Sequence, residues 1–130
     1  DYLKEENVRC ILGPYLTTRS KIELENSTIK APKVFADAGV KFAIMTDHPV
    51  IPLHYLPVCA AVAVREGLDE TTALKSITIH AAEIAGIADR VGSLEIGKDA
   101  DIALFDSHPL DFRCHAKKVF IDGKIVYEAE

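Results

Sequence analysis

The chain is poor in cysteine, and the three that it has, Cys10, Cys59 and Cys114, match no zinc-binding spacing. Their odd number also argues against a disulfide framework, and the apolar surroundings of Cys10 and Cys59 predict small core residues. No apolar run approaches the roughly 20 residues that a membrane span needs, and the polar, acidic first residues do not resemble a signal peptide. We therefore expect a cytoplasmic protein that contacts no membrane.

Positive charge is also scarce. The 130 residues contain 15 lysines and arginines against 20 aspartates and glutamates, which gives a net charge of −5. Because Lys117-Lys118 is the only adjacent basic pair, the sequence predicts no basic patch and no nucleic-acid partner. The composition is otherwise typical of a globular protein, with 48% apolar and 27% charged residues, and the length suits one domain or parts of two.

Two short apolar runs frame a helical pattern in the first 46 residues. The second run is almost continuously apolar, as expected of a parallel strand that is buried on both faces. Strand, helix and strand at this spacing predict a right-handed βαβ unit. The expected elements are a short helix at Tyr2 to Glu6, a strand at Val8 to Leu12, a loop over 15–27, a helix from about Ala31 to Ala38 and a strand at Val40 to Thr46.

Residues 53–90 are rich in alanine and poor in turn residues, which predicts helices packed against one another. Asp69 suits the N-cap of one of these helices and Thr78 the N-cap of the next. The expected helices are 53–66 ending at Gly67, Glu70 to Ser76, and Thr78 to Ile84 closed by Gly86.

The pattern changes at Val91, where glycines begin to separate short β-prone runs. Asp122-Gly123 between two such runs is a strong signal for a two-residue hairpin turn. We also expect Asp99 and Asp101 to accept hydrogen bonds from loop amides. The sequence thus predicts a separate antiparallel β unit with strands at Ser93 to Ile96, Asp101 to Asp106, Lys118 to Ile121 and Lys124 to Glu128.

Asp47 is the most informative residue, because it places a carboxylate just past the end of a buried strand. It stands in the segment Ile44-Met45-Thr46-Asp47-His48-Pro49, in which the proline cannot continue a central strand. A carboxylate just past a buried strand, followed by a histidine and a proline, is typical of an active-site edge, so Asp47 is a candidate active-site group. The alternative is that Asp47 only caps the turn before Pro49.

Further segments lie at a characteristic spacing from Asp47. They are the helical run Ala73 to Ile87, then Gly92-Ser93-Leu94-Glu95-Ile96-Gly97-Lys98-Asp99-Ala100-Asp101, and last Val119 to Lys124. From about residue 8 onward the chain resembles the amidohydrolase superfamily, in particular imidazolonepropionase-like and Xaa-Pro dipeptidase-like enzymes. This resemblance implies an α/β fold with the last part of a (β/α)8 TIM barrel (strands 7 and 8 and the following helices) over 1–90. It also implies the C-terminal half of a composite β-sandwich over 91–130.

The resemblance implies a metal-dependent hydrolase that cleaves the C–N bond of a cyclic amide or a dipeptide. Asp47 corresponds to the family's eighth-strand aspartate, which binds a divalent metal and carries the proton of the hydrolytic water. Zinc is the first expectation, with iron or manganese as alternatives. A catalytic zinc takes about three protein ligands, and the family's His-x-His motif is absent here. Since a whole barrel takes roughly 250 residues, we expect the C-terminal fragment of a longer enzyme, inactive and metal-free by itself.

The remaining candidates follow the two predicted strands. The residues that could contact a substrate are His48, His54, Tyr15 and Thr17, although His48, as a loop residue, could equally be solvated. His80 stands where the resembling family usually has asparagine, and we expect it to have a structural role. His108 and His115 should be surface residues.

A second class of function stays open, namely a non-catalytic structural or binding module. Two parallel strands alone would have bare edges, which a second copy could cover by edge pairing or by domain swapping. We therefore expect a homo-oligomer. As a hydrolase fragment, the chain would belong to an enzyme whose substrate is a small-molecule amide or a dipeptide. The sequence does not identify that substrate, because the specificity loops of the earlier strands are absent.

Overall fold

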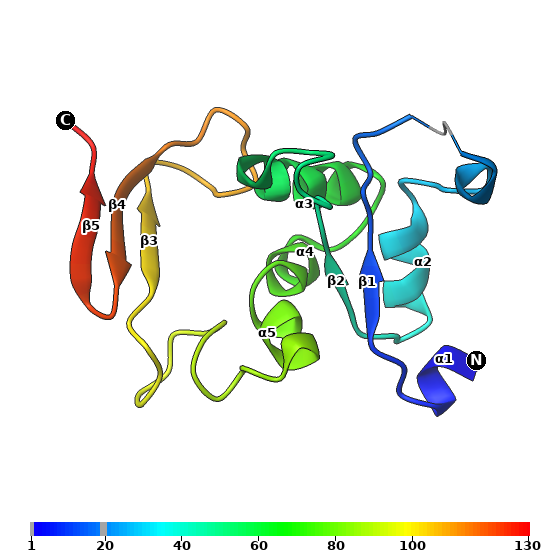
Figure 1. Ribbon diagram of the computed structural model, residues 1–130, viewed down its shortest axis with the longest axis horizontal. Coiled ribbons are helices and arrows are strands. Elements are labelled where there is room, and N and C mark those ends of the chain that lie inside the picture. The colour runs from blue at the N-terminus through cyan, green and yellow to red at the C-terminus, as the bar shows by residue number, and fades with distance from the viewer. Residues whose placement is uncertain (1, 19–20) are drawn as a thin grey trace.

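Two separate β-sheets organise the computed structural model, which describes residues 2–18 and 21–130 (Figure 1). The helices and strands are, in order, α1 (Tyr2–Glu5), β1 (Cys10–Leu12), the 3-10 helix η1 (Ile22–Leu24), α2 (Ala31–Asp37), β2 (Phe42–Ile44), the 3-10 helix η2 (Leu53–Tyr55), α3 (Leu56–Arg65), α4 (Glu70–Ser76), α5 (Ile79–Ala85), β3 (Ile102–Phe105), β4 (Ala116–Ile121) and β5 (Lys124–Glu128). No helix among the described residues is long and apolar enough to cross a membrane.

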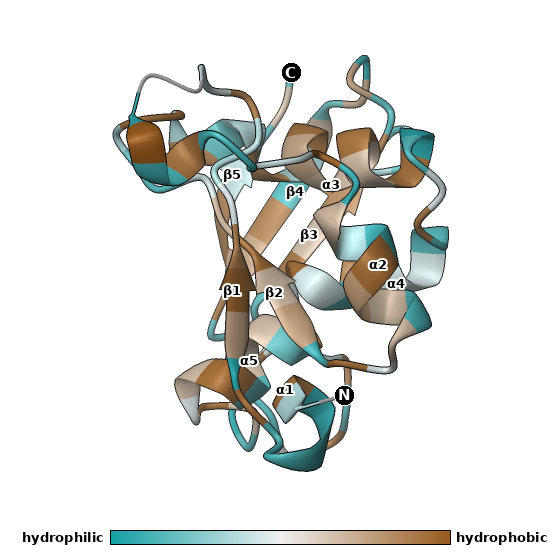
Figure 2. Cartoon of the chain, turned by 90° about the vertical axis from the view of Figure 1, so that its right-hand side faces the viewer, coloured by the Kyte–Doolittle hydropathy of each residue, from teal (hydrophilic) through white to brown (hydrophobic). Residues whose placement is uncertain are grey.

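The first sheet is the parallel pair of β1 and β2, joined by α2, which confirms the predicted βαβ order. Cys10 pairs with Phe42 and Leu12 with Ile44, so both strands run in the same direction and end at the same edge. Every residue of β2 is buried, whereas Ile11 of β1 is 54% exposed. Figure 2 shows the two strands side by side, both coloured toward the hydrophobic end of the scale.

Local chemistry determines where α2 begins and ends. Pro32 lies in its first turn, where the missing N–H costs nothing, and Gly39 follows its end with φ 69°, a left-handed conformation that suits glycine. The helix packs on β2 through an edge-to-face pair of Phe35 and Phe42, whose ring centroids lie 6.2 Å apart. The helix predicted from about Ala31 is thus confirmed.

Helices α3, α4 and α5 lie on the opposite side of β2 from α2 (Figure 1). The small side chains of Cys59, Ala60, Ala63 and Ala73 let these helices approach the strand closely. The complete core cluster is Phe42, Ile44, Ile51, Cys59, Ala60, Ala63, Leu68 and Ala73. Cys59 is thus a core residue as predicted, whereas Cys10 is only partly buried. The predicted helix over 53–66 is divided, because the 3-10 helix η2 precedes α3.

The caps of α4 and α5 differ from one another. The Asp69 carboxylate accepts a hydrogen bond from the Thr72 backbone N–H at 2.9 Å, so the predicted N-cap is confirmed. Thr78 also stands at a helix N-cap, but its hydroxyl donates to the Leu74 carbonyl at 2.7 Å and caps nothing in α5. Gly86 closes α5 with φ 75°, as expected of a left-handed C-cap.

The second sheet is an antiparallel meander of β3, β4 and β5. Asp122 (φ 49°) and Gly123 (φ 72°) form the two-residue turn between β4 and β5 with positive φ at both positions, which confirms the hairpin. The strand predicted over Ser93 to Ile96 is wrong. Its polar groups bond locally instead, because the Ser93 hydroxyl lies 2.6 Å from a Glu95 carboxylate oxygen and the Lys98 ammonium donates to Ser93.

The loop predicted over 15–27 contains the short 3-10 helix η1. Its positions 19 and 20 lie outside the described residues.

Candidate active-site edge

The carboxyl ends of β1 and β2 meet at one edge of the parallel pair. The Met45 backbone N–H donates to the Leu12 carbonyl at 2.9 Å, which extends the pairing past β2. Gly13 then has φ 142°, and a Cβ added there would lie 2.4 Å from the Met45 carbonyl oxygen. Only a residue without a side chain permits this approach, so Gly13 brings the loop after β1 against the segment that carries Asp47.

Asp47 is the point at which the chain turns from the core to the surface. Thr46 is 4% exposed, whereas Asp47 is exposed and has φ 55°, a left-handed conformation that aspartate tolerates better than most residues. The Asp47 carbonyl accepts a hydrogen bond from the Val50 backbone N–H at 2.8 Å, which closes a turn around a cis His48-Pro49 peptide. None of the ion pairs within 2–18 and 21–130 uses the Asp47 carboxylate.

The two histidines predicted to contact a substrate lie on the same stretch as Asp47. His48 is exposed beside it, and His54 belongs to η2, where its ring lies on Tyr55 with centroids 4.2 Å apart. Within the described part of the chain, no group of three or more histidine, cysteine, aspartate or glutamate side chains is arranged to hold a metal ion. The substrate contacts of His48 and His54 stay predictions.

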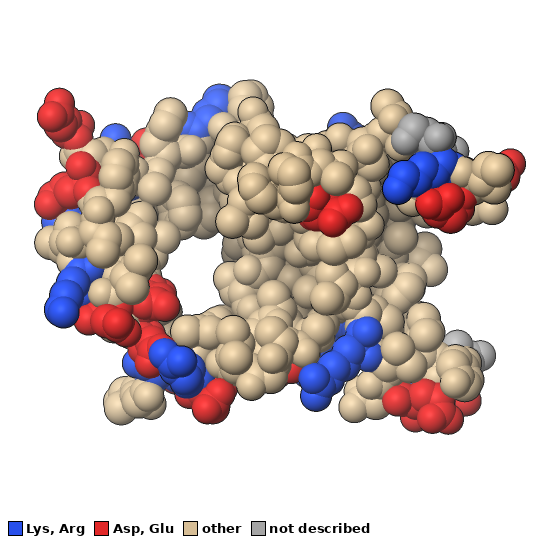
Figure 3. Space-filling view, in the orientation of Figure 1, with Lys and Arg blue, Asp and Glu red and all other residues tan. Residues whose placement is uncertain are grey.

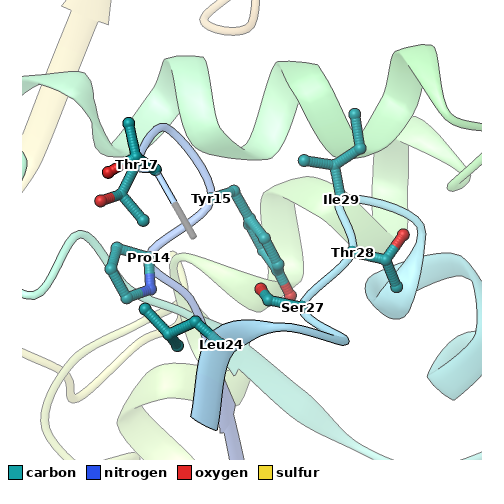
Figure 4. A pocket seen from close by; sticks show the side chains of 8 residues that line it. Pro14, Tyr15, Thr17, Leu24, Ser27, Thr28 and Ile29 are labelled. Atoms are coloured by element: carbon teal, nitrogen blue, oxygen red, sulfur yellow. The ribbon is translucent and has the colours of Figure 1, made fainter. Parts of the chain in front are cut away.

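A polar cavity of about 230 Å³ opens in the loop after β1 (Figure 4). Tyr15 and Thr17, both predicted to lie near the site, are on its wall. The Tyr15 side chain packs partly against the core, and burial, followed by the nearby Cys59 thiol, raises the pKa of its phenol. The lining residues are Pro14, Tyr15, Thr17, Thr18, Leu24, Ser27, Thr28 and Ile29.

Ser27, Thr28 and Thr18 were not expected at this cavity from the sequence. They reach it because η1 turns the loop back toward Tyr15, so that positions a dozen residues apart face one space. The signal that could have found them is the high density of hydroxyl side chains between the first strand and Ala31.

His80 lies at the other end of β2 from Asp47. It is on α5, one turn before Glu83, whose carboxylate pairs at 2.6 Å with Lys41, the residue that precedes β2. Burial lowers the pKa of His80, and its Nδ1 is buried without a hydrogen-bond partner among the described residues. This surrounding agrees with the expected structural role, and His108 and His115 are exposed as predicted.

The fold is a mixed α/β arrangement with a carboxylate at a strand end, and the comparisons with known proteins agree with it. Residues 2–126 match the model of the family described as "Amidohydrolase family". The chain belongs to the amidohydrolase family.

Two curated relatives illustrate the match. The chain is 32% identical over 108 residues to the amidohydrolase tasK of Hapsidospora irregularis, covering 83% of this chain and 11% of that protein. It is 34% identical over 106 residues to the imidazolonepropionase of Thermoplasma volcanium, covering 74% of this chain and 26% of that enzyme. The chain therefore spans about a quarter or less of the length of these relatives.

Solved structures share the fold. A crystal structure of an amidohydrolase from Thermotoga maritima superposes with a TM-score of 0.95 and 41% identity over 98% of this chain and 33% of its own. A Xaa-Pro dipeptidase with bound methionine in its active site superposes with a TM-score of 0.67 and 27% identity. The match covers 78% of this chain and 25% of the dipeptidase chain. An adenosine deaminase from Xanthomonas campestris with bound zinc superposes with a TM-score of 0.66 and 25% identity. The match covers 96% of this chain and 33% of the deaminase chain.

Proposed function

We propose that this chain is the C-terminal part of a metal-dependent hydrolase that cleaves the C–N bond of a cyclic amide or a dipeptide. The observation that carries the proposal is the exposed Asp47 carboxylate at the carboxyl end of β2, in a chain that belongs to the amidohydrolase family. Relatives named as imidazolonepropionase and as Xaa-Pro dipeptidase support both substrate classes.

In this proposal β1 and β2 are strands 7 and 8 of a (β/α)8 barrel that occupies residues 1–90. The parallel pairing and the fully buried β2 support a barrel, as does the half-exposed Ile11, which a neighbouring strand would cover. A matched protein three times as long, such as the amidohydrolase from Thermotoga maritima, has enough chain for the other strands.

Residues 91–130 would form half of a composite β-sandwich. Every residue of β5 is exposed, including three large apolar ones, and a sheet normally buries one apolar face. Between α4, α5 and β3 lies a groove of about 700 Å³ with mostly apolar walls, visible as a hollow beside the sheet in Figure 3. Both features support the presence of further chain against this sheet in the complete enzyme.

The metal would be held by Asp47 together with ligands from the rest of the enzyme. An exposed carboxylate without an ion pair suits a divalent cation, with zinc first and iron or manganese as alternatives, and a zinc-containing relative supports this order. When bound, the metal would polarise the scissile carbonyl and lower the pKa of the hydrolytic water. The Asp47 carboxylate would take the proton of that water and deliver it to the leaving amine.

Neighbouring residues would contact the substrate. His48 and His54 follow Asp47 on one surface stretch, and Tyr15 faces the loop cavity at the same edge. Because one carboxylate cannot hold a catalytic zinc, the 130-residue chain alone would be inactive and metal-free. We propose a cytoplasmic location for the enzyme; the three cysteines of this chain are free thiols, as is usual for proteins of that compartment.

A chimaera tests the proposal. In it this chain replaces the matched third of the Thermotoga maritima amidohydrolase, and Asp47→Asn is compared with Asp122→Asn, an aspartate that also has positive φ. The measurements are metal content by mass spectrometry and hydrolysis of a panel of cyclic amides and dipeptides. We expect Asp47→Asn to lower turnover by at least about 10²-fold, in the range of general acid–base effects, and Asp122→Asn to leave it unchanged. Equal activity of both variants would refute the role of Asp47.

A second candidate function is a non-catalytic module that pairs its edges with a second copy. The observation in its favour is β5, which is an edge strand with Ile125, Val126 and Tyr127 about half exposed. Analytical ultracentrifugation of the 130-residue chain measures whether it forms a dimer. Together with the activity of the chimaera, this result distinguishes the two candidate functions. A stable dimer together with an inactive chimaera would favour the module.

A further inference from the structure

We propose that the cavity in the loop after β1 is a subsite for an uncharged, hydrogen-bonding group of the substrate, such as a carboxamide. The role of this cavity within an active site rests on the proposed hydrolase function. Its preference for a neutral group rests on the cavity itself.

The cavity lies at the same edge as Asp47. The loop leaves β1 at Gly13, whose backbone lies against the Met45 carbonyl, and Tyr15 follows two residues later. Asp47 is likewise two residues beyond Met45. In Figure 1 both segments lie at the upper ends of β1 and β2, so a substrate at Asp47 has the cavity loop as a neighbour.

The described walls of the cavity are polar and carry no charged side chain. Of the eight lining residues that the structure describes, five carry a hydroxyl group and none is an aspartate, glutamate, lysine, arginine or histidine. Hydroxyls both donate and accept hydrogen bonds, as a carboxamide does. A carboxylate or an ammonium would lose hydration there and find no opposite charge among the described lining residues, which is unfavourable.

Tyr15 adds an unsatisfied group to this wall. Its hydroxyl is buried and has no hydrogen-bond partner within the described part of the chain. Figure 4 shows its ring pointing across the loop toward Ser27. Buried polar groups in native proteins are nearly always paired, so a ligand group that forms a hydrogen bond with the Tyr15 hydroxyl would satisfy it.

The volume limits what can enter. At about 230 Å³ the cavity is smaller than the roughly 300–1,000 Å³ of sites that hold a whole small molecule. It therefore suits one group of a substrate rather than the whole. Pro14, Leu24 and Ile29 supply apolar wall beside the hydroxyls, which suits a short aliphatic stem next to the polar group.

Three probes of similar size test the inference: neutral N-acetylglycinamide, anionic N-acetylglycine and cationic glycinamide. Each is titrated at pH 6.5 into the ¹⁵N-labelled chain while backbone amide shifts are followed. We expect the neutral probe to shift the amides of Thr17, Ser27 and Thr28 and to bind at least about fivefold more tightly than either charged probe, as for one or two hydrogen bonds. Equal binding of the three, shifts elsewhere, or no saturable binding would overturn the subsite.

Two variants and a control localise the effect. Thr17→Val and Ser27→Ala each remove one wall hydroxyl and should weaken the neutral probe about three- to tenfold. Thr71→Val on the exposed face of α4 should leave it unchanged. If both wall variants keep full affinity while their amide spectra remain those of the folded chain, the assignment of the site is wrong.

The failure of this inference is distinguishable from that of the hydrolase proposal. Turnover by the chimaera without any preference for the neutral probe would overturn the subsite alone. Selective binding of the neutral probe by a chimaera without turnover would support the subsite and count against the hydrolase proposal.

Discussion

The Asp101 carboxylate accepts a hydrogen bond from the Asp122 backbone N–H at 3.0 Å, across 21 residues of sequence. One residue earlier, the Ala100 carbonyl accepts from the Gly123 N–H, also at 3.0 Å. The start of β3 thus binds the turn of the β4–β5 hairpin. The expected hydrogen bond from a loop amide to Asp101 is thus present, and it ties the second sheet together.

Replacing Asp101 with alanine should destabilise the second sheet. The change leaves the Asp122 amide without its partner, at a cost of about 1 kcal/mol in the free energy of unfolding. Urea denaturation followed by circular dichroism measures this. Asp89→Ala is a suitable control, because Asp89 is an exposed aspartate in the same part of the chain. Equal stability of the two variants would show that the bond contributes nothing.

Gly13→Ala should be more damaging than Gly86→Ala. Both positions have positive φ, so both variants bear backbone strain of about 1–2 kcal/mol. At Gly86 an added Cβ meets no atom of the described residues within 4 Å, whereas at Gly13 it meets the Met45 carbonyl oxygen at 2.4 Å. We expect Gly13→Ala to lose at least about 2 kcal/mol of unfolding free energy in the same denaturation assay. A loss no larger than that of Gly86→Ala would remove the argument for close strand ends.

His80 should make the protein less stable in mild acid. Burial lowers the pKa of His80, Glu83 opposes this shift, and Lys41, the Phe42 backbone and Lys75 contribute smaller effects of both signs. Because the unfolded chain then binds the proton more readily, the contribution of His80 to stability is complete above its unfolded pKa of about 6.5. It is lost as the pH falls below that value toward the lowered pKa of the folded state.

The corresponding experiment compares urea unfolding at pH 7.5 and at lower pH for His80→Asn and for His108→Asn, an exposed histidine. The decline of stability below about pH 6.5 should become shallower in His80→Asn alone. An unchanged pH dependence in His80→Asn would contradict the assigned cause.

Leu68→Ala should create a cavity in the main core. Leu68 is 3% exposed and belongs to the cluster around Phe42, and such truncations cost about 2–5 kcal/mol. Ile22→Ala removes a side chain that is 89% exposed and should change the unfolding free energy by less than about 0.5 kcal/mol. A thermal unfolding midpoint that falls equally in both variants would mean that α3 and α4 do not enclose a common core.

Most expectations that depend on a few neighbouring residues were confirmed, with the N-cap at Thr78 as the exception. Asp69 binds the amide of Thr72 three residues later, and Asp122-Gly123 forms a hairpin turn because both residues tolerate positive φ. The predicted strand over Ser93 to Ile96 failed because a strand needs a pairing partner from elsewhere in the chain. Its residues are β-prone, but Ser93 finds its partners in Glu95 and Lys98, and no strand among the described residues pairs with the segment.

By itself, the sequence determined most of the order of strands and helices, the cap at Asp69, the turn at Asp122-Gly123, and Asp47 as the candidate carboxylate. These features depend on backbone conformation and on partners within about four residues, which the local sequence contains. Only the tertiary structure decided that Gly13 touches Met45 and that Tyr15 shares a cavity with Ser27 and Thr28. Such contacts depend on how distant segments pack, and packing is a property of the whole folded chain rather than of any short stretch.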